Sequence, residues 1–111
     1  MSIPFDWQQL SQLAGDDPEF ELELLQLFLS DVQASLGQLA NAIAVGDTVS
    51  AEQIAHYIKG ASANVGAIAL AAEAAQLEQR AQQGQLTQVQ PSLEQLKVSY
   101  SDVQQAIAAR Y

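Results

Sequence analysis

The apolar repeat between residues 18 and 45 limits the fold of this chain more than any other feature. Large apolar side chains recur there at steps of three and four residues. This is the period of an α-helix with one buried side, and no part of the chain shows the alternation typical of a strand. The sequence therefore predicts an all-α protein whose longest helix buries a stripe formed by Phe28, Val32, Leu36, Leu39 and Ile43.

Residues that typically begin and end helices divide the whole chain. Asp17 is a good N-cap, Pro18 suits the first helical position, and Gly46 ends the long helix. Because Pro91 is tolerated only near a first turn, the start of the last helix is defined only to within several residues. Taken along the chain, these signals predict five helices, at about 6–14, 18–45, 48–64, 67–83 and 87–109.

Short connections join the four longer helices, and short connections make neighbouring helices antiparallel. We therefore predict an antiparallel up-down four-helix bundle, with the additional short N-terminal helix packed on it as a lid. Residues 1–111 are expected to form a single domain, because this length suffices for one hydrophobic core. Gly37 lies within the second predicted helix, where only a close contact with another part of the chain would account for it.

The formal net charge of −9 narrows the range of functions. It argues against binding to nucleic acid, which needs a basic surface, and against binding to anionic membranes. The chain has no cysteine and one histidine, so neither a thiolate nor a histidine-rich metal site is expected. Since no signal peptide and no apolar run of bilayer length can be found, we expect a soluble, cytoplasmic protein. We also expect it to be a monomer.

The only histidine, His56, lies in the third predicted helix together with Lys59, one of four basic residues. When Ile58 is taken as the centre of the buried side, His56 lies about 160° away around the helix. The imidazole is therefore predicted to face solvent. Because a lone surface histidine is usually only a polar surface residue, its neighbours decide whether it has a function.

Gly60 follows the histidine by about one helical turn and leaves the imidazole uncovered. Helical side chains lean toward the N-terminus, so any side chain at position 60 would lie over the ring. A mid-helix glycine costs about 0.5–1 kcal/mol relative to alanine, which indicates that the space itself is needed. Lys59 would carry its ammonium beside the ring. A bare imidazole next to a cation suits a group that accepts and gives up a phosphoryl.

The run from His56 to Ala67 reads His-Tyr-Ile-Lys-Gly-Ala-Ser-Ala-Asn-Val-Gly-Ala. It closely resembles the motif of the histidine-containing phosphotransfer (HPt) domains of multistep phosphorelays, and it matches that motif without a gap. The length and helix order of the chain are also similar to theirs. The resemblance implies a phosphoryl carrier of a two-component system, in which His56 accepts a phosphoryl group from a receiver-domain aspartate. The carrier would then pass the group to another response regulator.

The resemblance also implies roles for residues around the histidine. Lys59 would stabilise the phosphoryl group, and Gly60 would leave access to the ring. In the family, an acidic or amide residue on the following helix orients the histidine by accepting a hydrogen bond from the ring nitrogen that is not phosphorylated. Glu78 matches this position, although a surface glutamate without a role remains the alternative. Gln82, one turn later, is expected near the phosphoryl.

No cofactor is expected in this chain, and the resemblance implies that the partner receiver domain supplies Mg²⁺. No Gly-rich loop or Mg²⁺-binding cluster resembles an ATP site, so we expect a carrier and not an enzyme. Its partners would be receiver domains and a hybrid histidine kinase. Two alternatives stay open: a helical adaptor that binds without phosphotransfer, and a phosphoacceptor domain that a histidine kinase phosphorylates directly in trans. Val49 and Tyr57, outside the buried arc, are candidates for a docking surface.

Overall fold

The computed structural model describes residues 5–111, apart from the side chains of Leu86 and Gln88. The described residues form helices and no strand, so the predicted all-α class is confirmed. The first four residues of the domain predicted over 1–111 lie outside this description. Each helix limit differs from the predicted one by one residue at most. The helices are α1 (Trp7–Leu13), α2 (Pro18–Ala44), α3 (Thr48–Val65), α4 (Ile68–Gln82) and α5 (Leu86–Arg110).

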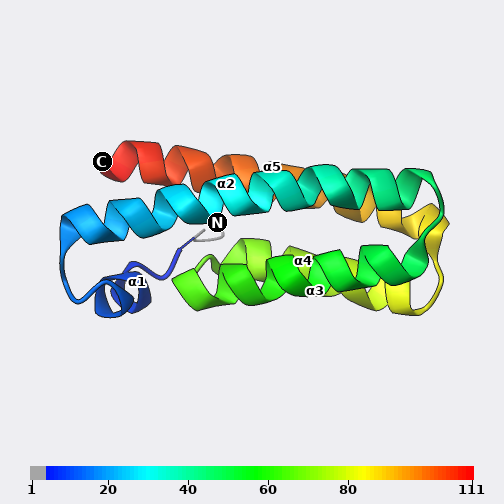
Figure 1. The fold of residues 1–111 in the computed structure, drawn as a ribbon, viewed down its shortest axis with the longest axis horizontal. Helices are drawn as coiled ribbons and strands as arrows, with labels where there is room; N and C mark the ends of the chain where they lie inside the picture. The colour runs from blue at the N-terminus through cyan, green and yellow to red at the C-terminus, as the bar shows by residue number, and fades with distance from the viewer. Residues whose placement is uncertain (1–4) are drawn as a thin grey trace.

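The four long helices form the predicted antiparallel bundle (Figure 1). Helices α2 and α5 lie side by side in one layer, and α3 and α4 lie side by side in the other. Helix α3 therefore packs against both α2 and α4, and α5 completes the ring. The short helix α1 lies across one end of the bundle, where it contacts α2 and α3.

Capping side chains fix the starts of α2 and α3. Asp17 accepts hydrogen bonds from the backbone N–H groups of Glu19 and Phe20 at the start of α2. Asp47 accepts from the backbone N–H of Ser50 at the start of α3, at 3.0 Å. An N-cap of this kind typically stabilises a helix by about 1 kcal/mol. These caps set where the two helices begin.

The core lies between the two layers and follows the predicted stripes. Large apolar side chains from every helix are buried there, and shortening one of them to alanine typically costs about 2–5 kcal/mol. Most of the stability of the bundle therefore comes from packing between helices, since amphipathic helices in proteins are stabilised mainly by tertiary packing and not by helix propensity. The largest fully buried side chains include Leu10, Leu25, Leu39, Ile58, Leu70, Leu77, Leu96 and Val103.

A glycine lets the N-terminal segment approach the turn between α3 and α4. Gly66 has a φ of +84°, and its carbonyl accepts a hydrogen bond from the Asp6 backbone N–H at 2.7 Å. A Cβ on Gly66 would lie only 2.8 Å from the Asp6 carbonyl oxygen. The Gln9 side chain also donates to the Ala63 carbonyl at 2.8 Å. Helix α1 is thereby held against the C-terminal end of α3.

Gly37 and Pro91 both lie inside helices, in α2 and α5. The suggestion that Gly37 makes a close contact is wrong, because this glycine is exposed and a Cβ there would have nothing within 4 Å. The structure offers no physical account of this glycine. Pro91 lies inside α5, which begins at Leu86 and continues beyond the proline to Arg110.

Glu21 has an environment that its place in the first turn of α2 does not indicate. The sequence suggests only a favourable interaction with the helix dipole, whereas the structure buries this side chain to 5% exposure. Its carboxylate accepts hydrogen bonds from Ser11 Oγ at 3.2 Å, from Arg110 Nε at 3.2 Å and from the Tyr111 hydroxyl. The Arg110 guanidinium also stacks over the Trp7 ring at 4.4 Å. This cluster ties α1, α2 and the end of α5 together.

Candidate functional site

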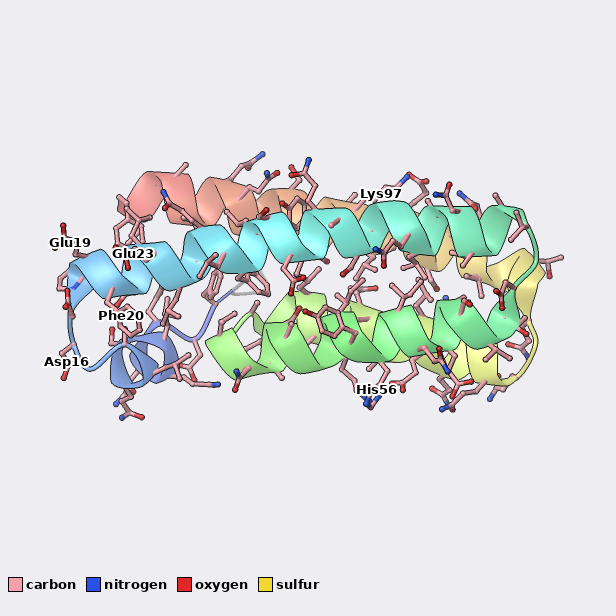
Figure 2. All side chains as sticks on the ribbon, in the orientation of Figure 1. Asp16, Glu19, Phe20, Glu23, His56 and Lys97 are labelled. Atoms are coloured by element: carbon pink, nitrogen blue, oxygen red, sulfur yellow. The ribbon has the colours of Figure 1, made fainter. Side chains whose placement is uncertain are left out.

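The histidine of α3 faces solvent, as its helical position predicts. The His56 side chain is 68% exposed, and Figure 2 shows it pointing outward from α3. The opposite side of this helix is buried in the core and consists of Ala51, Ala55, Ile58, Ser62 and Val65. The imidazole is therefore accessible, while the helix that carries it is held by packing.

The neighbouring helix supplies a carboxylate to the imidazole. His56 Nδ1 lies 2.7 Å from Glu78 Oε2, across the interface between α3 and α4. The Glu78 side chain is only 12% exposed, so it is not the plain surface glutamate that the sequence left open. An ionised carboxylate can only accept, so the proton of a neutral imidazole in this contact is on Nδ1. That tautomer leaves the lone pair of Nε2 free on the exposed ring.

The same carboxylate also binds the lysine of the motif. Lys59 Nζ donates to Glu78 Oε1 at 2.6 Å, and the Lys59 side chain is 37% exposed. The hydrogen bond from Lys59 lowers the pKa of Glu78 most; burial acts in the opposite direction, and the bond to His56 adds to the lowering. The sequence placed the ammonium beside the ring but did not anticipate this ion pair. Glu78 thus bridges the two polar groups of α3.

The space above the imidazole is open. A Cβ placed on Gly60 would have nothing within 4 Å, and the glycine is exposed in the middle of α3. No packing inside the protein therefore requires glycine at this position. What glycine provides here is room at the surface, next to the ring of His56.

A second polar pair lies near His56. Gln82 Nε2 donates to Glu52 Oε1 at 3.1 Å, which joins the end of α4 to the first part of α3. Both residues line a surface hollow together with Gln53, His56 and Glu78. The structure thus brings Gln82 to the neighbourhood of His56. The sequence shows Glu52 one turn before the histidine, but nothing in it indicates the contact with Gln82.

The surface between α2 and α3 is partly apolar. Tyr57, directly after the histidine, is 51% exposed and donates a hydrogen bond from its hydroxyl to Asp31 of α2. This hydrogen bond raises the pKa of Tyr57 above its ordinary value. Leu27 and Val49 are 70% and 62% exposed. A groove between the two helices runs past Leu27 and reaches Asp31.

Within residues 5–111, no group of three or more histidine, cysteine, aspartate or glutamate side chains is placed to hold a metal ion. No helix among those described is long and apolar enough to cross a membrane.

The fold and the site together define a class of protein: a four-helix bundle that presents a carboxylate-bound histidine on its surface. The family model of the Hpt domain matches residues 23–106. The chain belongs to this family. It is therefore a histidine phosphotransfer carrier of phosphorelays and not a kinase, and its partners are of the receiver and kinase classes.

Two solved structures are similar over most of their length. One is histidine-containing phosphotransfer protein B (HptB) from Pseudomonas aeruginosa PAO1, with a TM-score of 0.90 and 28% identity over 100% of this chain and 99% of that one. The other is a putative histidine-containing phosphotransfer protein from rice, with a TM-score of 0.86 and 24% identity over 96% and 78% of the two chains. The rice protein shows likeness of fold alone. A comparison with curated proteins found no match.

Proposed function

We propose that His56 is the phosphoacceptor of this carrier. The observation that supports this most directly is the contact between Nδ1 of an exposed imidazole and Glu78, at 2.7 Å. With Nδ1 protonated, Nε2 attacks the phosphorus of a receiver's aspartyl phosphate. The P–O bond to the aspartate breaks, its electron pair stays on the released carboxylate, and a P–N bond forms. The reverse step, on a second receiver, passes the group onward.

Lys59, Gly60 and Glu78 have separate roles in this proposal. Glu78 keeps the proton on Nδ1 and fixes the ring. Lys59, already next to the site, stabilises the phosphoryl by a charge-assisted hydrogen bond. Gly60 leaves room for the phosphoryl and the partner's active site. Mg²⁺ is supplied by the receiver domain, and this chain contributes the nucleophile and a surface.

We further propose that the receiver docks on the side of the bundle formed by α2 and α3. The exposed apolar side chains of Leu27, Val49 and Tyr57 lie on these two helices, and Tyr57 directly follows His56. Burying such side chains against a partner provides binding energy next to the reacting atom. The whole chain, residues 1–111, would act as one domain and as a monomer. It would have no ATP site of its own. It would work in the cytoplasm, where a kinase transfers phosphoryl groups from ATP into the relay.

The test is incubation with a panel of phosphorylated receiver domains from the same organism. The parent should take up phosphate on histidine, recognised as an acid-labile and base-stable modification, and return it to a second receiver. His56→Gln should take up none, while its stability changes by less than about 0.5 kcal/mol because the residue is exposed.

Other results of this experiment would favour the alternatives. Receiver binding without any phosphohistidine would indicate a helical adaptor. Labelling by a histidine kinase and ATP in the absence of any receiver would indicate direct phosphorylation in trans. A large loss of stability in His56→Gln would contradict the exposed site.

A further inference from the structure

The pair formed by Glu52 and Gln82 has no part in the transfer step described above, yet it lies beside the reacting ring. Glu52 Oε1 accepts from Gln82 Nε2 at 3.1 Å, and both side chains line the hollow that also includes His56. We propose that Glu52, held in place by Gln82, raises the phosphoryl-transfer potential of phosphorylated His56. This inference rests on the proposed function of His56.

Helix geometry places the carboxylate within reach of the phosphoryl group. Glu52 precedes His56 by four residues, so the two lie on the same face of α3 with their Cβ atoms about 5–6 Å apart. Helical side chains lean toward the N-terminus, so the imidazole extends back toward the turn that carries Glu52. Nδ1 is turned to Glu78. Glu52, His56 and Glu78 all line one surface hollow, so a phosphoryl on Nε2 is carried by a ring that borders this hollow beside Glu52.

The charge of Glu52 is not neutralised by an ion pair in the described part of the chain. Its contact there is with the neutral amide of Gln82, which restricts the carboxylate without cancelling its charge. The cation nearest in sequence, Lys59, is bound to Glu78. The other basic side chains contact different partners: Arg80 contacts Ser92, Lys97 contacts Glu94, and Arg110 contacts Glu21.

A fixed negative charge beside a phosphoryl dianion disfavours the phosphorylated carrier. When the group moves to a receiver, the P–N bond breaks, a P–O bond to the aspartate forms, and this repulsion is relieved. In a water-like dielectric, one unit charge at roughly 6–10 Å from each of the two phosphoryl charges shifts such an equilibrium about four- to tenfold. Glu52 would thus favour onward transfer, whereas Lys59 favours uptake.

The first experiment needs no receiver. Phosphoramidate, whose P–N bond breaks to release ammonia, can phosphorylate an accessible imidazole, and His56 is the only histidine of the chain. Phosphorus NMR then follows the second ionisation of the phosphoryl as the pH changes. Glu52→Gln keeps a hydrogen-bonding partner for Gln82 but removes the charge.

Glu52→Gln should increase the acid ionisation constant of the phosphoryl about two- to threefold, the effect of one unit charge at this range. Asp102→Asn, on the exposed side of α5, removes the same charge elsewhere and should leave the constant unchanged. Equal constants in the parent and Glu52→Gln would overturn the inference.

The role of Gln82 is tested by combining substitutions. In Gln82→Ala the carboxylate of Glu52 is free to turn into solvent, so adding Glu52→Gln should change the ionisation constant less than it does in the parent. An equal change in both backgrounds would show that Gln82 does not position Glu52. If Gln82 had only a structural role, its substitution would not alter the effect of Glu52 on the ionisation constant of the phosphoryl group.

A receiver that exchanges phosphate completes the test. At equilibrium, Glu52→Gln should shift the distribution of phosphate toward the carrier about four- to tenfold relative to Asp102→Asn. Transfer without this shift would overturn the inference and leave the proposed function intact. If phosphorylated His56 can be prepared but no receiver exchanges with it, the proposed function fails. The ionisation constants then still test whether the charge of Glu52 acts on the phosphoryl group.

Discussion

Lys59 Nζ lies 2.6 Å from Oε1 of Glu78. The other oxygen of this carboxylate is 2.7 Å from His56 Nδ1, so one side chain of α4 holds both polar groups of α3. In the proposed reaction, Lys59 has to share its ammonium between Glu78 and the arriving phosphoryl. Glu78 therefore has two effects that substitutions can separate: it keeps the proton on Nδ1, and it holds the cation.

Two substitutions of Glu78 should differ in their effect on the ring. In Glu78→Gln the amide oxygen can still accept from Nδ1–H, so nitrogen NMR of the labelled imidazole should resemble that of the parent. In Glu78→Ala this acceptor is gone, and the spectrum should show a mixture of the two neutral tautomers. A parent-like spectrum of Glu78→Ala would mean that the contact does not fix the tautomer.

Lys59→Ala should slow phosphoryl transfer without abolishing it, and should shorten the lifetime of the bound receiver. Losing a hydrogen bond to a charged group typically costs about 1.5–3 kcal/mol, which corresponds to a roughly 10- to 150-fold lower rate. Rapid-quench measurement of transfer from a phosphorylated receiver checks this. The control is Lys97→Ala, since Lys97 pairs with Glu94 of α5 and lies away from His56 (Figure 2). If both variants were equally fast, Lys59 would have no role in transfer.

Gly60→Gln should be at least as stable as the parent but a much slower carrier. Glutamine gains about 0.5–1 kcal/mol over glycine in an exposed helix. Its side chain would lean back over His56 and block the approach of the receiver. Gly60→Ala should be intermediate in rate, since one methyl covers little of the ring.

Gly37→Gln is the matched control for this prediction. Gly37 is also exposed, in mid-helix and without a neighbour near its Cβ position, so it should show the stability gain and normal transfer. Thermal melting and transfer rates measure the two effects. A Gly60→Gln protein that transfers as fast as Gly37→Gln would contradict the requirement for access.

Gly66→Ala should destabilise the protein more than Gly84→Ala does. Both glycines have positive φ, at +84° and +69°, so alanine costs about 1–2 kcal/mol at either position. Only at Gly66 would the new Cβ meet a backbone atom, the Asp6 carbonyl oxygen at 2.8 Å. Urea unfolding should therefore give a larger loss for Gly66→Ala. Equal losses of unfolding free energy in the two variants would mean that the N-terminal segment moves away from position 66 without a cost in stability.

Glu78 should make the stability depend on pH in the acid range. Its pKa in the folded protein is lowered from 4.5, chiefly by the hydrogen bond from Lys59. A depressed carboxyl pKa stabilises the folded state fully above the pKa of the unfolded chain, and this contribution is lost as the pH falls through the folded-state pKa. The stability difference between the parent and Glu78→Gln should therefore shrink as the pH falls below about 4.5. A difference that stays constant across this range would contradict the ion pair.

The sequence alone determined the helices and the side of each helix that is buried. Apolar spacing defined the stripe through Phe28 and Val32, and capping residues such as Asp17 defined the ends. Both signals are local, because residues three and four apart share one face of a helix. The same periodicity placed His56 on the outside of α3, opposite Ile58. Resemblance to a known motif was needed to connect the imidazole with phosphotransfer and with Glu78.

Only the tertiary structure decided which side chains from different helices meet. Glu78 reaches both His56 and Lys59 because α4 packs against α3 in one register, and helical period does not specify a register between helices. The contact of Gln82 with Glu52 and the burial of Glu21 under the end of α5 depend on the same packing. The spacing of residues along one helix sets the directions in which their side chains point around the helix axis. Distances between helices follow from how their side chains interlock, which is a property of the whole core.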